Sequence, residues 1–324
     1  MSNHPRGRRA VFFFCAELER DPVAARVFEA SARLLDLRET GEEVDGFPVL
    51  AHRDAHGREL AYVRTADVLS HDYPRYLPAL TGRFAAYDLA LLVNWHEGAN
   101  APERILMAHT TGDVPSATFG AADPGLTLGV LRALERARAE AGLDHYRTVT
   151  EATHWSGVPR GHPPALLAAY PVPLLDVEIG SSPASWADPA AVEALARALP
   201  RVFDEADGPH ASLLCLGGVH FEPAFRDAVL GEARPHRVAV SHILANQWLA
   251  AGGYEGEEGV EKLAACAATI AGGVDAVVFH DNLKGPLKAS ARALAERLGV
   301  PAFQHRRLRQ PEPLFPAPVP ERRG

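Results

Sequence analysis

Five histidines and one glutamate lie at or near the ends of apolar runs in this sequence. They are His96, His109, His154, His220, His242 and Glu178. Imidazoles and a carboxylate that are brought together can hold a zinc ion or transfer protons in acid–base catalysis. The closely spaced motifs HExxH and CxxC are absent from the sequence. Any such site therefore has to be assembled by the fold from distant segments.

The apolar runs have the length of buried strands, and helical patterns separate them. We expect strands within residues 11–16, 89–94, 104–109, 172–179, 212–217, 237–244 and 275–281. We expect helices within residues 22–37, 126–143, 188–206, 260–273 and 287–299. This alternation predicts an α/β protein with a mostly parallel sheet and helices on both faces. Ligands of such sheets bind beyond the carboxyl ends of the strands, where the histidines are expected.

The composition is that of a globular protein with an acidic balance. The 324 residues carry a formal net charge of −8, which argues against a broad nucleic-acid-binding surface but permits a small local contact. No run approaches the roughly 18 apolar residues of a membrane span, and the first apolar run is shorter than a signal-peptide core. We therefore expect a cytoplasmic protein with no membrane segment, whose three widely spaced cysteines are free thiols.

Several enzyme classes are disfavoured by the motifs that are missing. The sequence contains no GxSxG, P-loop or GxGxxG motif, which argues against a serine hydrolase, an NTPase and a Rossmann dehydrogenase. No Ser/Gly linker divides the chain. Residues 1–310 are therefore expected to form one domain, and the Pro-rich residues 311–324 to form a flexible tail.

Two of the candidate side chains follow consecutive strands. His96 and His109 can share one ion or substrate if their strands are neighbours, because adjacent parallel strands lie about 4.8 Å apart. The carboxylate of Glu178 sits inside an apolar run, which is costly unless it is paired or bound to a metal. Alternatively, it caps the backbone N–H groups of residues 180–182.

Other residues gain their interest from their neighbours. Gly217 and Gly218 precede His220 and allow the backbone to approach a ligand closely, so their N–H groups are candidate oxyanion donors. Glu151 alternates to the opposite strand face from His154, so we expect it to pair elsewhere or to support the site indirectly. His242 lies between apolar neighbours and is interpreted as a core residue.

Six segments in this order resemble the archaeal and plant type of D-aminoacyl-tRNA deacylase. They are HEGANAPERILMAHTTGD at 96–113, SATFGAADP at 116–124, EATH at 151–154, VEIGSSPASWADP at 177–189, GGVHFEPAF at 217–225 and SHIL at 241–244. The resemblance implies a single three-layer α/β/α domain with a mostly parallel mixed sheet, similar to peptidyl-tRNA hydrolases and nucleoside phosphorylases. It also implies hydrolysis of the ester between a D-amino acid and the 3′ terminal ribose of tRNA, assisted by zinc. The expected partner is the tRNA acceptor end, and the expected state is a monomer.

Residue pattern and resemblance together predict the site. The predicted catalytic residues are His96, Glu97, His109, Thr110, His154, Glu178 and His220. The predicted zinc ligands are His109, His154, Glu178 and His220. The predicted substrate-binding residues are Gly112, Gly180, Ser181, Gly217, Gly218, Lys284 and Arg306.

Three stretches depart from the family pattern. The chain has Asn94-Trp95-His96 in place of Ser-Arg-His, His154-Trp155-Ser156-Gly157 in place of His-His-Gly-Pro, and Gly112-Asp113 in place of Gly-Asn. His162 is a candidate for the place of the second histidine. Two other functions fit the same residues: a zinc-dependent peptidase or amidohydrolase, and a non-catalytic module that binds nucleosides or tRNA ends. The latter would follow if Asn94, Trp95 and Trp155 filled the pocket.

Overall fold

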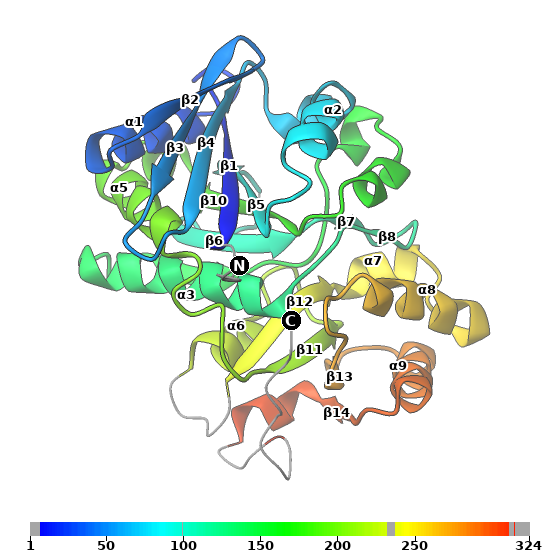
Figure 1. Ribbon diagram of the computed structural model, residues 1–324. Coiled ribbons are helices and arrows are strands. Elements are labelled where there is room, and N and C mark those ends of the chain that lie inside the picture. Colours follow the sequence, from blue (N-terminus) through cyan, green and yellow to red (C-terminus); the bar gives the residue numbers. More distant parts are fainter. Residues whose placement is uncertain (1–6, 99, 232–236, 311–313, 315–324) are drawn as a thin grey trace, which may run out of the picture.

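Two β-sheets form the frame of the molecule (Figure 1). The structure is a computed structural model and describes residues 7–98, 100–231, 237–310 and 314. The larger sheet has eight strands in the order β2-β3-β4-β1-β5-β10-β6-β9, and the smaller has four strands in the order β12-β11-β13-β14. The predicted α/β class with a large, mostly parallel sheet is confirmed, with the strands divided between two sheets.

The strands of the larger sheet are β1 (Arg9–Cys15), β2 (Arg38–Val44), β3 (Phe47–Arg53), β4 (Glu59–Thr65), β5 (Leu89–His96), β6 (Ile105–Thr110), β9 (Arg147–Thr150) and β10 (Leu174–Gly180). The smaller sheet contains β11 (Ala211–Leu216), β12 (Val238–Leu244), β13 (Ala276–Phe279) and β14 (Ala302–Gln304), and β7 (Gly112–Asp113) pairs with β8 (Thr118–Phe119). All pairs in the smaller sheet are parallel. In the larger sheet, β6 runs antiparallel to β10.

The helices are α1 (Ala24–Leu34), α2 (Tyr73–Arg83), α3 (Pro124–Glu140), α4 (Pro183–Trp186), α5 (Pro189–Ala198), α6 (Pro223–Leu230), α7 (Asn246–Ala251), α8 (Gly256–Ala268) and α9 (Gly285–Leu298). Short 3₁₀ turns are η1 (Leu69–Asp72), η2 (Val158–Arg160), η3 (Pro164–Ala169), η4 (Leu199–Arg201) and η5 (His305–Arg309). Asp188 caps α5 by accepting from the Ala190 N–H, and Pro189 opens the helix, as the sequence predicts. No described helix is long and apolar enough to cross a membrane.

The larger sheet is covered on both faces. Phe12 and Phe14 of β1 pack with α1, α3 and α5 on one side, whereas Val11 and Phe13 pack with the tyrosines of α2 on the other. A strand that is buried on both faces reads as a continuous apolar run, which is the pattern of β1. Helix α3 also contacts β12, while α8 and α9 cover the far face of the smaller sheet.

The segment of residues 151–154 joins the two sheets. It follows β9 of the larger sheet, and its Ala152 N–H donates to the carbonyl of His220 at 2.9 Å. The Thr153 N–H donates to the carbonyl of Ile243 in β12 at 2.8 Å. These bonds place the ends of β11 and β12 beside the larger sheet, so residues from both sheets can meet.

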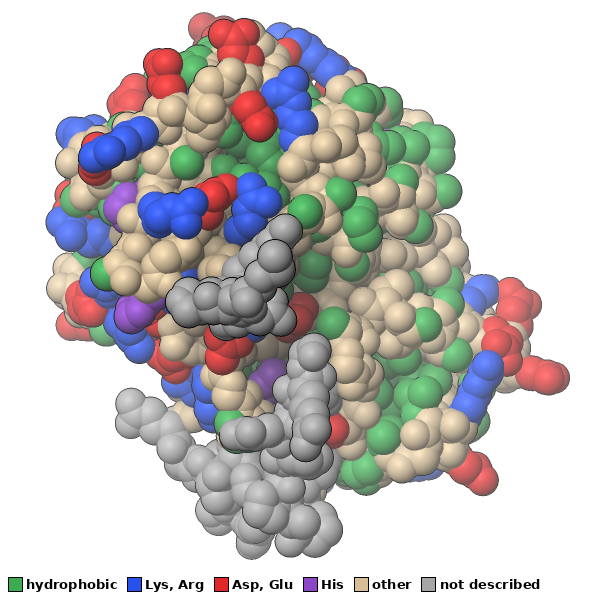
Figure 2. Space-filling view, in the orientation of Figure 1, with side chains coloured by type: hydrophobic (Ala, Val, Ile, Leu, Met, Phe, Trp, Pro, Cys, Tyr) green, Lys and Arg blue, Asp and Glu red, His purple; other side chains and the backbone are tan. Residues whose placement is uncertain are grey.

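Charges of both signs are mixed on the surface. On the face shown in Figure 2, Lys and Arg side chains are interspersed with Asp and Glu. The predicted flexible tail, residues 311–324, falls outside the described residues except for Leu314, and the single-domain boundary at residue 310 stays a prediction.

Candidate active site

Three neighbouring strands present polar side chains on one face of the larger sheet. His96 of β5 pairs with Gly180 of β10, and Asp176 of β10 pairs with His109 of β6. Alternate residues of a strand share a face, so Asp176 and Glu178 lie on the same side as both histidines. The expectation that His96 and His109 end adjacent parallel strands is wrong, because β10 lies between them and β6 is antiparallel. The histidines converge across the sheet face instead of at its edge.

Glu151 is the centre of the site. Its Oε1 is hydrogen-bonded to Nε2 of His220 and lies 3.5 Å from Nε2 of His96 and 3.9 Å from Nδ1 of His154. Its Oε2 lies 3.9 Å from Nε2 of His109. The predicted placement away from His154 is wrong because β9 ends at Thr150, so strand alternation no longer applies at Glu151.

The smaller sheet supplies His220. The residue follows β11 through Gly217 and Gly218, whose φ angles of 88° and 81° favour glycine. A Cβ atom at Gly218 would also meet the Glu222 side chain at 2.9 Å. The ring of His154 stacks on that of His109 at 4.0 Å and lies 5.3 Å from that of His220. The site therefore contains side chains from both sheets and from the segment that joins them.

Burial and neighbouring charges set the ionisation of the deepest pair. Burial raises the pKa of Glu151, but the surrounding histidines, led by His154 and His109, outweigh it and lower that pKa to about 2. Burial lowers the pKa of His109, but the carboxylates of Glu151, Asp176 and Glu178 raise it to about 10. His109 is thus a buried cation facing carboxylates.

The other groups of the site shift toward their neutral forms. Burial and the nearby His109 lower the pKa of His154 to about 3. Burial also lowers the pKa of His96. The pKa of Glu178 rises to about 8, chiefly through burial, and that of Asp176 rises for the same reason. Neutral imidazoles are the form that binds metals.

The donor atoms fit a divalent metal. Nδ1 of His96 lies 2.8 Å from Oγ of Ser181, which leaves Nε2 directed at Glu151. The 3.5 Å between that Nε2 and Oε1 of Glu151 is close to the separation of about 3.4 Å between two ligands of tetrahedral zinc. Nε2 of His109 and Oε2 of Glu151 are buried without a hydrogen-bond partner among the described residues. An imidazole nitrogen and a carboxylate oxygen are both atoms that can bind a metal ion.

Metal-type donors form three overlapping groups in the part of the chain that the structure describes. They are His96 with Glu151 and His220, His109 with Glu151 and His154, and His109 with Asp176 and Glu178. The four ligands predicted from the sequence are therefore distributed over three groups, two of which share Glu151. In the group of His96, Glu151 and His220, the two histidines line the open cavity.

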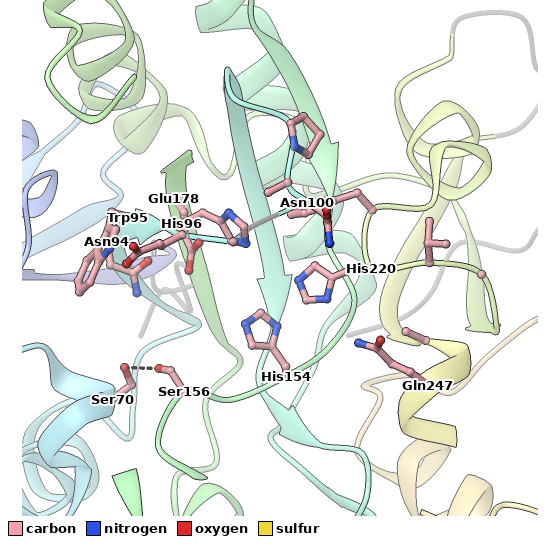
Figure 3. A pocket seen from close by; sticks show the side chains of 18 of the residues that line it. Ser70, Asn94, Trp95, His96, Asn100, His154, Ser156, Glu178, His220 and Gln247 are labelled. Carbon is pink, nitrogen blue, oxygen red and sulfur yellow. Dashed lines mark hydrogen bonds between the residues drawn. The ribbon is translucent and has the colours of Figure 1, made fainter. Parts of the chain in front are cut away.

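A cavity of about 970 Å³ opens above these groups. His96, His154, Glu178 and His220 line it, and Figure 3 shows their side chains gathered around its centre. Glu97 lines it as an exposed residue. Glu151 and His109 lie deeper, fully buried behind the lining. A substrate in the cavity would therefore contact the histidines, while Glu151 and His109 act through them.

Three of the predicted site residues are packed tightly against their neighbours. A Cβ atom on Gly112 would meet the Thr153 side chain at 2.8 Å, and one on Gly180 would meet His96 Cβ at 2.9 Å. Thr110 is buried, and its Oγ1 lies 2.8 Å from Oγ1 of Thr153 and 2.9 Å from Nδ1 of His242. The structure thus places Gly112, Gly180 and Thr110 beneath the site, where they hold its strands together.

The predicted oxyanion donors already have partners. The Gly217 N–H donates to the Leu244 carbonyl at 2.8 Å, and the Gly218 N–H donates to Oδ1 of Asn282 at 3.4 Å. Ser181 supports His96 through its hydroxyl. The exposed Lys284 and Arg306 do not border the described cavity.

The departures from the family pattern leave the cavity open. Trp155 is buried against Tyr73, with ring centroids 5.3 Å apart. Asn94 donates to Oδ1 of Asp176 at 2.7 Å. Nε2 of His162 lies 2.8 Å from the backbone carbonyl of His71, and His162 belongs to none of the three metal-type groups. The expectation that it replaces a site histidine is wrong.

Two acidic residues of the site were missed or misplaced by sequence reasoning. Asp176 precedes Glu178 by two residues in one apolar strand, so strand alternation would have placed both on one face. No local signal marks Glu151, because its direction depends on where β9 ends. His242, interpreted as a core residue, is buried and bonded to Thr110, Thr153 and Thr269.

The fold and the site together define an α/β protein with a buried histidine–carboxylate cluster beneath an open cavity. A family model described as D-aminoacyl-tRNA deacylase matches residues 83–303, more than half of the chain. The chain belongs to the D-aminoacyl-tRNA deacylase family.

Curated relatives agree with this assignment, and a solved structure shares the fold. A D-aminoacyl-tRNA deacylase from Haloarcula marismortui is 36% identical over 172 residues, 49% of this chain and 34% of that relative. The match thus spans about a third of that protein's length. One from Pyrobaculum neutrophilum is 30% identical over 206 residues, 62% of this chain and 68% of the relative. The crystal structure of a conserved protein of unknown function shares the fold, with a TM-score of 0.72, 16% identity and coverage of 93% and 96% of the two chains.

Proposed function

We propose that this protein hydrolyses the ester between a D-amino acid and the 3′ terminal ribose of tRNA. Four histidines gathered around Glu151 at the base of a cavity of about 970 Å³ carry the proposal. The relatives that the chain matches are named D-aminoacyl-tRNA deacylases. An aminoacyl ester is already activated, so the site needs only a nucleophile, a proton acceptor and charge stabilisation.

The position of each residue in the site suggests which of these roles it has. His96, Glu151 and His220 would hold a zinc ion, which would lower the pKa of a bound water to about 7 and polarise the ester carbonyl. Ser181 fixes the orientation of the His96 ring. His109 balances the charge of Glu151 from below. The monomeric state and the cytoplasmic location stay predictions.

His154 is the proposed proton acceptor. Its Nδ1 lies 3.0 Å from the Ala152 carbonyl, to which it donates, so Nε2 is left as the acceptor. The residue lines the cavity, so this nitrogen is placed to take a proton from the attacking water.

Cations lie beside the cavity and would grip the acceptor end. Arg306 pairs with Asp281, and Nζ of Lys288 donates to the Asp281 carbonyl at 2.7 Å. Asn282, the next residue, borders the cavity. Charge reversal of Lys284 and Arg306 should weaken tRNA binding without changing the preference for D- over L-esters, because phosphate contacts position the substrate.

The test is loss of ester from D- and L-aminoacyl-tRNA, with and without a chelator. We expect the D-ester to be cleaved more than about a hundredfold faster, because a clash of a few kcal/mol rejects the other placement of the side chain. His220→Ala should abolish cleavage. His56→Ala, which changes an exposed histidine in the turn between β3 and β4, is the matched control. Equal rates on both esters, or cleavage of small peptides instead, would support the peptidase alternative.

A further inference from the structure

The cavity extends to both sides of the histidines, and its two ends differ in chemistry. Its lining includes Trp95, Ser70 and Ser156, and also Phe221, Gln247 and Asn282. The Phe221 ring lies 5.2 Å from that of His96 and 4.8 Å from that of His220. Figure 3 shows Trp95, Ser70 and Ser156 on one side of His154, with Gln247 on the opposite side. An ester held at the histidines therefore has room for one substituent in each direction.

The end at Phe221 offers amides and an aromatic ring. Oδ1 of Asn282 accepts from the Gly218 N–H at 3.4 Å and lies 2.6 Å from Nδ1 of His280. The side-chain amide of Asn282 is exposed and borders the cavity, so it can also bond a ligand. Gln247 is exposed on the first turn of α7, and Phe221 is half-buried beside His220.

These groups suit a nucleoside. Side-chain amides pair with the donor and acceptor atoms on the edge of adenine, and aromatic rings stack on unpaired bases. Among the described residues that line the cavity there is no Lys or Arg, so the lining offers no cationic partner for a phosphate. Lys288 and Arg306 contact Asp281, the residue before Asn282. A terminal nucleoside bound at Asn282 would place the phosphate that precedes it near these two cations.

The end at Trp95 suits a side chain of modest size. Oγ of Ser156 donates to Oγ of Ser70 at 2.7 Å, so these hydroxyls bond each other. The Trp95 ring is half-buried and lies 6.0 Å from the ring of His71 in an edge-to-face arrangement. The two hydroxyls are hydrogen-bonded to each other, so the surface beside the indole ring has few polar atoms that need a partner. Such a surface would accept apolar or aromatic groups.

We propose that the terminal adenosine binds between Phe221, Gln247 and Asn282, and that the side chain of the D-amino acid lies against Trp95. This assignment rests on the proposed ester hydrolysis. It makes Trp95 the residue that selects among D-amino acids, and it makes the two amides the residues that recognise the tRNA end.

The adenosine end is tested by calorimetric binding of adenosine 5′-monophosphate, which requires no ester. The Gln247→Ala/Asn282→Ala double variant should bind about tenfold more weakly, as expected for lost neutral hydrogen bonds. Trp95→Phe and the exposed control Gln310→Ala should bind like the parent protein. No binding to the parent protein, or equal binding by the double variant, would overturn the adenosine assignment.

The amino-acid end is tested with D-alanyl-, D-leucyl- and D-tyrosyl-tRNA. Trp95→Ala should change the ratios of kcat/KM among the three esters, and Trp95→Phe should change them in the same direction to a smaller extent. The amide double variant should raise KM equally for all three. Unchanged ratios in both Trp95 variants would overturn this assignment. If no ester is cleaved by the parent protein, the proposed hydrolysis fails and the amino-acid assignment with it, while the calorimetry still decides the adenosine end.

Discussion

Oε1 of Glu151 lies 3.5 Å from Nε2 of His96, although the two residues come from different parts of the chain. His96 ends β5 of the larger sheet, and Glu151 follows β9 at the far edge of the same sheet. The carboxylate thereby faces histidines from both sheets. Two of the three groups of metal-type donors among the described residues contain Glu151. Together these two groups include His96, His109, His154 and His220.

Glu151→Gln should abolish ester cleavage while keeping the shape of the side chain. The amide removes the negative charge that balances His109 and that would bind the metal, so we expect a rate loss of at least about a hundredfold. Zinc content measured by mass spectrometry should fall in parallel. Glu97→Gln, at the exposed rim of the cavity, should retain its metal. A fully active Glu151→Gln enzyme would contradict the central role of this carboxylate.

Removal of metal should inactivate the protein reversibly. Dialysis against a chelator should stop cleavage of D-aminoacyl-tRNA, and added Zn²⁺ should restore it, because metal ligation by imidazole and carboxylate is reversible. His96→Ala should contain less metal than the parent protein and should not recover. Undiminished activity in metal-free protein would show that the histidines act by acid–base catalysis alone.

His109→Ala should destabilise the fold strongly. From sequence position alone, a histidine at a strand end is expected to contribute little packing, but this side chain is only 2% exposed and lies within 4 Å of three carboxylates. Its loss leaves the ionised, buried carboxylate of Glu151 without its cationic partner, which costs about 3–5 kcal/mol. Urea denaturation measures the effect, with His56→Ala as the exposed control.

A second change provides a specific check on that explanation. Adding Glu151→Gln to His109→Ala removes the ionised carboxylate that His109 faces, so the double variant should recover part of the lost stability. A loss below about 1 kcal/mol for His109→Ala, or no recovery in the double variant, would show that the ion cluster contributes little.

Thr110→Val should lower stability but leave the rate per folded molecule intact. The hydroxyl bonds Thr153 and His242 at the junction of the two sheets and does not border the cavity. Loss of these neutral bonds costs about 1–2 kcal/mol. Thr81→Val on the exposed side of α2 is the matched control. A large fall in kcat without a change in the midpoint of unfolding would show that Thr110 takes part in catalysis.

Asp21 should make the fold less stable as the pH rises from about 4 to 7. Burial raises the pKa of this carboxyl from 3.8 to about 7, against the hydrogen bonds that it accepts from Val23 and Ala24 N–H. In that window the unfolded chain has lost a proton that the folded chain keeps. The free energy of unfolding is therefore highest at low pH and falls by up to about 4 kcal/mol as the pH rises.

The Asp21→Asn variant checks this dependence. Asparagine keeps an acceptor oxygen for the two N–H groups but cannot ionise, so its stability should fall less between pH 5 and 8. Asp144→Asn, at a side chain that is 96% exposed, should follow the parent protein. Parallel stability curves for the parent protein and Asp21→Asn in urea denaturation would rule out the raised pKa.

The positions of strands and helices were accessible from the sequence. Each of the seven predicted apolar runs overlaps an observed strand, such as residues 89–94 within β5 and 212–217 with β11. Buried strands need continuous apolar residues, and helices need spaced ones, so local composition records both. The motifs carrying the family resemblance also lie in the linear sequence, which is why the family was recognisable before the fold.

The arrangement of the site was decided by the tertiary structure. The order β5-β10-β6 and the antiparallel direction of β6 determine that His96, Glu178 and His109 meet across a sheet face. The end of β9 determines that Glu151 turns inward. Strand order, direction and ends depend on contacts between distant segments, whereas a sequence pattern reports only on neighbours along the chain. The sequence by itself thus determined which residue types and elements are present, and packing between the two sheets decided which of them touch.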